Sequence, residues 1–362
     1  MAIAGRPGAA LGLGGRHAAA AGSRPLAAPQ PPCRGRRLVV RRVAAPQKAP
    51  APGSGATSSA EEGGAAGDST GVLLVQCPDA KGVVAALAQL LFGFNCNILQ
   101  SDQFSDETLS PSRFFQRIHF DYADISVGRG NLGVLETAVA DLARRYEMDW
   151  KVSYRPKRKR VAVLVSKMDH CLFDLLIRTR SGELHADVPV VISNHPDLSH
   201  VAGMFGVDFE HLGVPAGPDR AAAKRTQEAA IQRVLDEADV DLIVLARYMQ
   251  IFSPEFCEAN WRRTINIHHS FLPAFEGAKP YHRAHERGVK IIGATAHYAT
   301  SELDAGPIIE QDITRITHRD SVQDMVRKGR DLERLVLARA VRWHVNDRVL
   351  VTPTGRTVVF QD

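Results

Sequence analysis

Three short segments in the C-terminal half of the chain carry the residues best suited to chemistry. They read Asn266-Ile-His268-His269, Gly293-Ala-Thr-Ala-His297 and Glu302-Leu-Asp304-Ala-Gly306-Pro307. An amide N–H can stabilise the oxyanion that forms when a nucleophile adds to a carbonyl carbon. An imidazole can donate or shuttle a proton near neutral pH, and a carboxylate can orient that imidazole and accept protons. The segments therefore favour carbonyl chemistry, with Asn266, His268 and Asp304 as the candidate residues.

The spacing of the first segment supports this interpretation. Asn266 and His268 are two residues apart in a predicted strand, so their side chains project from the same face, while His269 points away. Considered singly, each of the three candidates also has a structural explanation. Asn266 could be a turn residue at a strand end, His268 a core histidine, and Asp304 a loop cap.

The surrounding sequence predicts a sheet that would position these residues. Apolar strands are expected at 161–165, 188–193, 241–246, 264–267 and 291–298, and they alternate with helical stretches such as the amphipathic run 230–238. This rhythm is typical of a Rossmann-like parallel α/β sheet, whose ligands bind beyond the carboxyl ends of the strands. We assign residues 157–362 to this module.

Residues 70–156 predict a smaller α/β module ahead of it. Strands are expected at 71–75, 97–103, 114–120 and 150–154, and helices follow the first and third of them at 83–91 and 134–146. The order βαββαβ is that of a ferredoxin-like sandwich.

The charge of the chain is concentrated at its N-terminus. Of 45 Lys and Arg residues, nine lie in residues 1–60, which hold no Asp or Glu, so the rest of the chain has 36 basic and 40 acidic residues. A generic nucleic-acid surface is therefore not expected, and no apolar run approaches the roughly 20 residues that cross a bilayer. Residues 1–69, rich in Ala, Gly, Pro and Arg, predict an organellar transit peptide, mitochondrial or plastid, with a plain disordered extension as the alternative.

The 70–156 module resembles an ACT domain, a regulatory module that often binds amino acids. The resemblance rests on Cys77-Pro78-Asp79-x-x-Gly82 and on Asn97-Ile98. It implies an amino-acid effector, glycine or methionine, whose carboxylate would bind free backbone N–H groups of Gly82 and Val83 at a helix N-terminus. The alternative is a module used only for packing or dimerisation, and a homo-oligomer is expected.

Residues 70–362 as a whole resemble the formyl-transferring folate enzymes, whose signature is Asn-x-His with a downstream Asp. The segments Val165-Ser-Lys-x-x-His170-Cys171-Leu172, Leu245-Ala-Arg247-Tyr-Met249-Gln and His268-His-Ser-x-Leu-Pro-Ala-Phe-x-Gly-Ala-Lys-Pro-Tyr-His282 match the branch of the formyltetrahydrofolate deformylases. The resemblance implies that Asn266, His268 and Asp304 are catalytic, that water is the nucleophile, and that formate and tetrahydrofolate are the products. It implies no metal and no cofactor, because the folate is the substrate.

The same resemblance implies where the folate binds. One loop would contribute Met249, Gln250, Ile251 and Phe252, and a second would contribute Ala299, Thr300, Ser301, Glu302 and Leu303. A flat pterin requires such apolar walls together with backbone hydrogen bonds. His269 and the 166–170 loop are expected to control water entry. Two residues depart from the family pattern beside this cleft, Glu276 and Phe173, and they bear on substrate affinity.

Three other functions fit the sequence less well. A formyltransferase acting on a phosphorylated amine needs a compact, Gly-rich phosphate cradle after its first strand, and the turn here, Ser166-Lys-Met-Asp-His170, has no Gly. A zinc hydrolase is suggested by the number of histidines, but no His-Glu-x-x-His occurs. A non-catalytic amino-acid sensor is disfavoured by the intact Asn266, His268 and Asp304.

Overall fold

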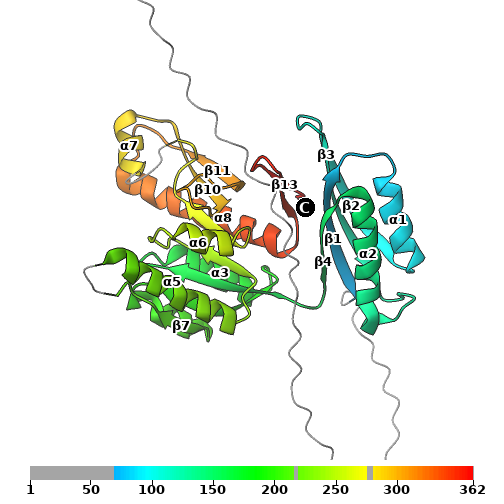
Figure 1. Ribbon diagram of the computed structural model, residues 1–362. Helices are drawn as coiled ribbons and strands as arrows, with labels where there is room; N and C mark the ends of the chain where they lie inside the picture. Colours follow the sequence, from blue (N-terminus) through cyan, green and yellow to red (C-terminus); the bar gives the residue numbers. More distant parts are fainter. Residues whose placement is uncertain (1–68, 216–218, 275–279, 362) are drawn as a thin grey trace, which may run out of the picture. The chain divides into compact units, whose positions relative to one another are not determined.

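The computed structural model describes residues 69–215, 219–274 and 280–361 (Figure 1). The predicted transit peptide at residues 1–68 and the departure at Glu276 lie outside the described residues. No helix within the described ranges has the length and apolar character that a membrane span requires.

The first described elements have the predicted order. They are β1 (Thr70–Pro78), α1 (Val83–Gly93), β2 (Asn97–Asp106), β3 (Arg113–Asp121), α2 (Leu132–Tyr146) and β4 (Asp149–Tyr154). The strands form an antiparallel sheet in the order β2-β3-β1-β4. Figure 1 shows α1 and α2 on the same face of this sheet, where Leu87, Phe120 and Leu135 are fully buried.

The turn before α1 differs from its expected form. Gly82 is the N-cap residue and has a φ of 94°, a conformation that glycine adopts without steric cost. The N–H of Val83 donates to the Ala80 carbonyl oxygen at 3.5 Å, so the prediction that it is a free donor is wrong. The reason is that the chain forms a tight turn before the helix begins.

The second sheet contains seven strands in the order β11-β10-β9-β8-β5-β6-β7. They are β5 (Lys159–Val165), β6 (Ala186–Ser193), β7 (Asp208–His211), β8 (Leu242–Leu245), β9 (Thr264–His268), β10 (Ile291–Tyr298) and β11 (Ile308–Arg315). Strands β5 to β9 are parallel, as predicted, but β10 runs antiparallel to β9 and to β11. The prediction of a parallel sheet is therefore wrong for β10, because an apolar run locates a strand without giving its direction.

Helices cover both faces of this sheet. They are α3 (His170–Arg180), α4 (Ser199–Phe205), α5 (Arg220–Glu237), α6 (Pro254–Ala259), α7 (Pro280–Arg287) and α8 (Val322–Val345). The alternating side chains of β5 divide the core: Val163 packs with α3 and α8, whereas Leu164 packs with α5 and α6. Phe173 lies against this core and contacts Phe205, with 6.4 Å between the ring centroids.

The chain ends in a hairpin of β12 (Val349–Val351) and β13 (Thr357–Val359). Leu350, Val358 and Phe360 from this hairpin region pack with Val72, Leu74 and Phe115 of the first sheet. Asp347, just after α8, forms ion pairs with Lys151 and Lys159. The hairpin region therefore shares an apolar cluster with the first sheet, and the buried Asp347 pairs with one lysine of β4 and one of β5.

Candidate active site

A cavity of about 410 Å³ opens at the carboxyl ends of β8 and β9 and is bordered by the loop after β10. This is the edge at which a parallel α/β sheet binds its ligands. The cavity is lined by Leu245, Arg247, Tyr248, Met249, Gln250, Ile251, Phe252, Cys257, Asn266, Ile267, His268, His269, His297, Ala299, Thr300, Glu302, Leu303 and Asp304. The three predicted catalytic residues therefore share one cavity.

Asn266 is oriented by a histidine on the neighbouring strand. The β9–β10 ladder pairs Asn266 with His297, and Asn266 Nδ2 lies 3.2 Å from His297 Nε2. His297 Nδ1 lies 3.0 Å from the carbonyl oxygen of Tyr298, which can only accept, so Nδ1 carries the proton. In the neutral ring Nε2 is then an acceptor, and the Asn266 amide must present its NH₂ group to it. The second N–H of that amide is left for a ligand.

His268 and Asp304 form the second pair of the site. His268 Nδ1 lies 3.2 Å from Asp304 Oδ1, and His268 Nε2 is buried without a hydrogen-bond partner among the described residues. Burial raises the pKa of Asp304, but the hydrogen bond from His268 Nδ1 outweighs this effect and holds the pKa below its usual range. Asp304 is therefore a carboxylate at neutral pH and accepts from His268 Nδ1. The other ring nitrogen of His268, Nε2, is then available to bind a ligand.

The loop that carries Asp304 is held tightly against β10. A Cβ atom at Gly306 would lie 1.7 Å from the Tyr298 carbonyl oxygen, so only glycine allows this close approach. The N–H of Tyr298 donates to the Pro307 carbonyl oxygen at 2.9 Å. Asp304 itself has a φ of 57°, a conformation uncommon outside glycine and tolerated best by Asn and Asp. The loop thus fixes the carboxylate beside His268.

Eight of the nine predicted folate contacts line the cavity, and Ser301 does not. Met249, Ile251 and Leu303 are large apolar side chains that are more than half exposed at its rim. The N–H of Met249 donates to Ser166 Oγ at 3.0 Å, which anchors this rim to the turn after β5. No residue of the 166–170 loop lines the cavity, so its expected part in water entry finds no support in the geometry.

Two other expectations about side chains near the cleft are wrong. His269 was expected to point away, but it lines the cavity, because β9 ends at His268 and strand alternation ends with it. Burial, followed by the positive charge of Arg247, lowers the pKa of His269 to about 4, so the ring is neutral at pH 7. Phe173 was expected beside the cleft, but it does not line the cavity; it is partly buried between α3 and α4, against the core.

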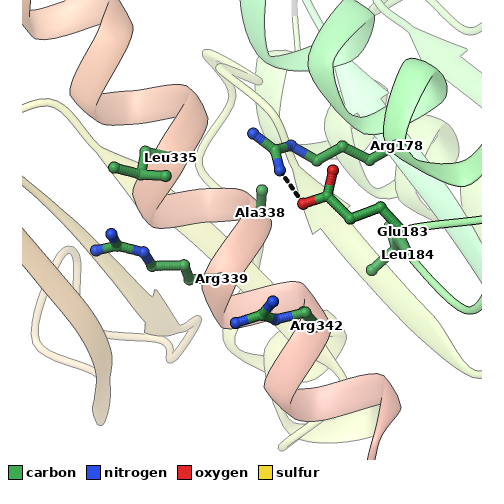
Figure 2. Close-up of a pocket in the computed structure, with 7 residues that line it drawn as sticks. All are labelled: Arg178, Glu183, Leu184, Leu335, Ala338, Arg339 and Arg342. Carbon is green, nitrogen blue, oxygen red and sulfur yellow. Dashed lines mark hydrogen bonds and ion pairs between the residues drawn. The ribbon is translucent and has the colours of Figure 1, made fainter. Parts of the chain in front are cut away.

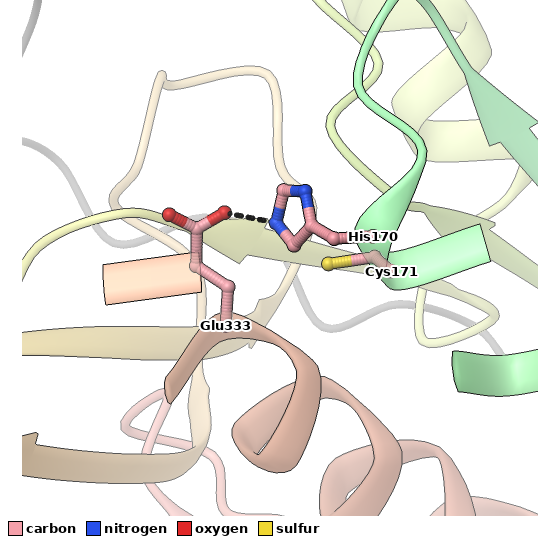
Figure 3. Close-up of side chains that lie close together, drawn as sticks. All are labelled: His170, Cys171 and Glu333. Atoms are coloured by element: carbon pink, nitrogen blue, oxygen red, sulfur yellow. Dashed lines mark hydrogen bonds and ion pairs between the residues drawn. The ribbon is translucent and has the colours of Figure 1, made fainter. Parts of the chain in front are cut away.

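His170, Cys171 and Glu333 form a cluster whose potential ligand atoms all lie within 4.8 Å of one another (Figure 3). His170 Nε2 already donates to Glu333 Oε2 at 2.8 Å. Burial raises the pKa of the Cys171 thiol well above its usual value, which opposes the thiolate form that metals bind. Three donors in this state fall short of the four ligands of a structural zinc site. Two of the three side chains, His170 and Glu333, are therefore already paired with each other, and the protonated thiol of Cys171 is a poor metal ligand.

A smaller cavity of about 90 Å³ lies between α3 and α8 (Figure 2). It is lined by Arg178, Glu183, Leu184, Leu335, Ala338, Arg339 and Arg342. Arg178 and Glu183 form an ion pair on the side opposite α8, and the wall includes none of the candidate catalytic residues. The cavity lined by Asn266, His268 and Asp304 is therefore the candidate active site.

Comparison with known proteins identifies the family. The sequence profile of the formyl transferase family matches residues 159–341. A formyltetrahydrofolate deformylase from Synechocystis is 50% identical over 291 residues, which cover 80% of this chain and 98% of that protein. A crystal structure of a formyltetrahydrofolate deformylase from Pseudomonas syringae is 43% identical, has a TM-score of 0.76, and covers 82% of this chain and 96% of that one.

The chain belongs to the formyltetrahydrofolate deformylase family. Its second module has the α/β fold of the formyltransferases, with a mixed sheet. A crystal structure of glycinamide ribonucleotide transformylase 1 from Symbiobacterium toebii is also similar, with 32% identity and a TM-score of 0.54, but it covers 57% of this chain. The similarity to the deformylases extends over a larger share of the chain, and the predicted resemblance to them is confirmed.

Six residues line the cavity of this deformylase family member without having been assigned to its site from the sequence: Leu245, Arg247, Tyr248, Cys257, Ile267 and His297. His297 had a signal, because it ends a strand close to the motif that contains Asp304. Arg247 also had one, because it lies in the Leu245-Ala-Arg247-Tyr-Met249 segment that matched the deformylases. Neither signal reveals which residues His297 and Arg247 contact, because these contacts depend on how strands and helices that are distant in the sequence pair in the fold.

Proposed function

We propose that this protein hydrolyses 10-formyltetrahydrofolate to formate and tetrahydrofolate, within one-carbon and purine metabolism. The observation that carries the proposal is the pairing of His268 Nδ1 with the Asp304 carboxylate at 3.2 Å. It leaves the buried Nε2 without a partner among the described residues, at the wall of the cavity that Asn266 also lines. Membership of the formyltetrahydrofolate deformylase family names the substrate on which this arrangement acts.

In the reaction we propose, the oxygen of a water molecule adds to the formyl carbon. The free N–H of Asn266 donates to the oxyanion that develops on the formyl oxygen. Asp304 orients His268 and stabilises its protonated form, so that His268 can move a proton within the tetrahedral intermediate. The bond between the formyl carbon and N10 then breaks, and a proton that came from water ends on N10.

The apolar part of the cavity suits the pterin of the folate. We propose that the pterin lies between the loop after β8 and the loop after β10, where its contacts are Met249, Gln250, Ile251, Phe252, Ala299, Thr300, Glu302 and Leu303. The cavity volume of about 410 Å³ falls within the usual range for small-molecule sites. The three catalytic side chains supply an oxyanion donor, a proton carrier and an orienting charge, so we propose that no metal or cofactor is required.

The remaining proposals concern the rest of the chain. We propose that residues 70–156 form an ACT regulatory domain that binds glycine or methionine, and that residues 157–362 form the catalytic domain. The βαββαβ order and the left-handed Gly82 before α1 support the first assignment. We also propose that residues 1–69 direct the protein to an organelle, mitochondrion or plastid, and that the protein is a homo-oligomer.

The test is an assay of formate and tetrahydrofolate released from 10-formyltetrahydrofolate by the full chain, with no amine present. We expect equal amounts of the two products. His268→Gln should lower turnover by about 10² to 10⁴, the usual value of a positioned acid or base. The matched control is His285→Gln on the exposed face of α7, which should retain the wild-type rate. An inactive wild type, or an equal loss in both variants, would contradict the proposal.

A further inference from the structure

A buried polar network centred on Glu333 adjoins the active cavity. Glu333 lies on α8 and is 2% exposed. Its Oε2 lies 2.8 Å from His170 Nε2 and 3.5 Å from Arg247 Nε, and its Oε1 accepts from the hydroxyl of Tyr281 at 2.9 Å. Figure 3 shows the His170 ring pointing at the Glu333 carboxylate. The carboxylate thus joins α3, α7 and the segment after β8 at one point.

The network touches the cavity at two places. Arg247 lines the cavity directly. His269 also lines it, and its ring centroid lies 6.0 Å from that of Tyr281 and 5.2 Å from that of His268. Glu333, His170 and Tyr281 do not line the cavity themselves. They therefore support a wall whose inner surface is formed by Arg247 and His269.

The backbone of Arg247 has an uncommon conformation. Its φ is 65°, in the left-handed region that is uncommon for any residue other than glycine. Strain of this kind persists where the surrounding structure requires a particular side chain. Here the guanidinium is held near Glu333. Burial alone would raise the pKa of Glu333, but the hydrogen bond from His170 and the charge of Arg247 hold it below its usual value.

The wall occupies the side of the site where a second substrate would be expected. Open α/β sheets bind ligands across the carboxyl ends of adjacent strands, and β5 is the neighbour of β8. The turn after β5, from Ser166 to Asp169, contributes nothing to the cavity wall, and His170 at the start of α3 is turned toward Glu333. On this side the cavity is therefore lined by Arg247 and His269 and not by the turn after β5.

Both water and an amine could in principle accept the formyl group. In each case the nucleophile bonds to the formyl carbon, the bond from that carbon to N10 breaks, and a proton from the nucleophile ends on N10. Water gives formate, and an amine gives an N-formyl amine. Since Asn266, His268 and Asp304 serve either reaction equally, the choice of acceptor must depend on access to the formyl carbon.

We propose that the Glu333 network determines acceptor specificity, by holding Arg247 and His269 as a wall that admits water to the formyl carbon and excludes amines. The inference rests on the proposed hydrolase function, and it names the residues that make water, and not an amine, the acceptor of the formyl group. The positive charge of Arg247 adds to the effect, because it repels protonated amines. Arg247 and Glu333 are specificity-determining and positioning residues, and they take no part in bond making.

The experiment uses the full chain, 10-formyltetrahydrofolate and hydroxylamine, a small amine that is largely uncharged at neutral pH. The ratio of formohydroxamate to formate is measured after the non-enzymatic reaction is subtracted. Wild type should give formate almost alone. Arg247→Gly relieves the backbone strain and removes the wall, and it should raise the ratio at least tenfold. Glu333→Gln keeps the shape of the side chain but loosens Arg247, and it should raise the ratio by a smaller factor.

Asp331→Asn is the matched control on the same helix. Asp331 is 62% exposed and pairs only with its helical neighbour Arg334 among the described residues, so this variant should keep the wild-type ratio. Circular dichroism establishes which variants fold. If Arg247→Gly does not fold, the product ratio of Glu333→Gln tests the inference. The inference is overturned if the folded variants keep the wild-type ratio, or if wild type already forms formohydroxamate as readily as they do. A wild type that releases no tetrahydrofolate contradicts the proposed function itself, which is a separate readout.

Discussion

His297 lies directly opposite Asn266 across the β9–β10 ladder, and its Nε2 is 3.2 Å from Asn266 Nδ2. The Tyr298 carbonyl oxygen fixes the proton on His297 Nδ1, and the ring in turn fixes which end of the Asn266 amide faces the cavity. Through the His297 ring, the Tyr298 carbonyl oxygen thus favours an orientation in which the Asn266 amide presents a donor to the cavity.

Replacing His297 should therefore disturb turnover more than binding. His297→Ala frees the Asn266 amide to rotate, and we expect turnover to fall by about 10 to 10² because a misplaced donor no longer meets the oxyanion. His297→Gln retains an oxygen that can accept from Asn266, and it should recover part of the loss. Turnover and the Kd of a non-hydrolysable folate analogue are measured for both. Equal defects in the two variants would show that His297 acts through packing rather than through the amide.

Asp304→Asn tests whether Asp304 orients His268 or instead binds the folate. The change keeps the size of the side chain but removes the charge that orients His268 and stabilises its protonated form. We expect turnover to fall by about 10² to 10⁴, with little change in folate affinity. Single-turnover formate release and equilibrium binding are the measurements. A large loss of affinity with nearly normal turnover would move Asp304 from the catalytic set into the pterin pocket.

The pKa of His269 predicts a pH dependence of stability. The folded value is about 4, whereas an unfolded histidine titrates near 6.5. Between about pH 4 and pH 6.5 the unfolded chain binds a proton at this histidine that the folded chain does not bind. The contribution of the neutral His269 to the free energy of unfolding is therefore complete above about pH 6.5 and is lost as the pH falls toward 4. Its upper limit is about 3 kcal/mol.

Urea unfolding between pH 4.5 and 7 tests this dependence. The free energy of unfolding should fall less steeply on acidification in His269→Gln than in wild type, because the glutamine does not titrate. Other groups titrate in both proteins and cancel in the comparison. Parallel curves would show that the His269 ring is more hydrated than its burial indicates.

Two truncations test the organisation of the chain. A chain that begins at residue 69 should keep wild-type stability and activity if the preceding segment serves only as an organellar address. A chain restricted to residues 157–362 retains every proposed catalytic residue but exposes Leu350, Val358 and Phe360, which pack against the first sheet. Exposure of a fully buried large apolar side chain costs about 1.5 to 3 kcal/mol, and exposure of the partly buried Leu350 and Val358 costs less, so this shorter chain should melt at a lower temperature. An unchanged melting temperature would show that the contact contributes little.

The sequence predicted what depends on local pattern. Asn266 and His268 share a face because strand alternation has a period of two, and both line the cavity as expected. The position of His297 beside Asn266 could not be predicted, because it depends on the antiparallel register of β9 and β10. Arg247 and Glu333 were missed for the same reason, since 86 residues separate them in the chain.

One unpredicted element did have a local signal. Helix α8 begins with a capping box, in which Ser321 Oγ accepts from the N–H of Asp324 and the Asp324 carboxylate accepts from the N–H of Ser321. This pattern is visible in the sequence, and it marks the start of the helix that carries Glu333. What the pattern does not reveal is that Glu333 faces inward to meet residues of α3 and α7.

The most direct test of the account is to run the reaction of the full chain in water enriched in ¹⁸O, without any amine, and to weigh the released formate by mass spectrometry. Attack of water on the formyl carbon predicts that each formate carries one oxygen from the solvent and one from the original formyl group, and that tetrahydrofolate appears in equal amount. Formate without solvent oxygen, or turnover that appears only when an amine acceptor is added, would contradict hydrolysis as the function of this protein.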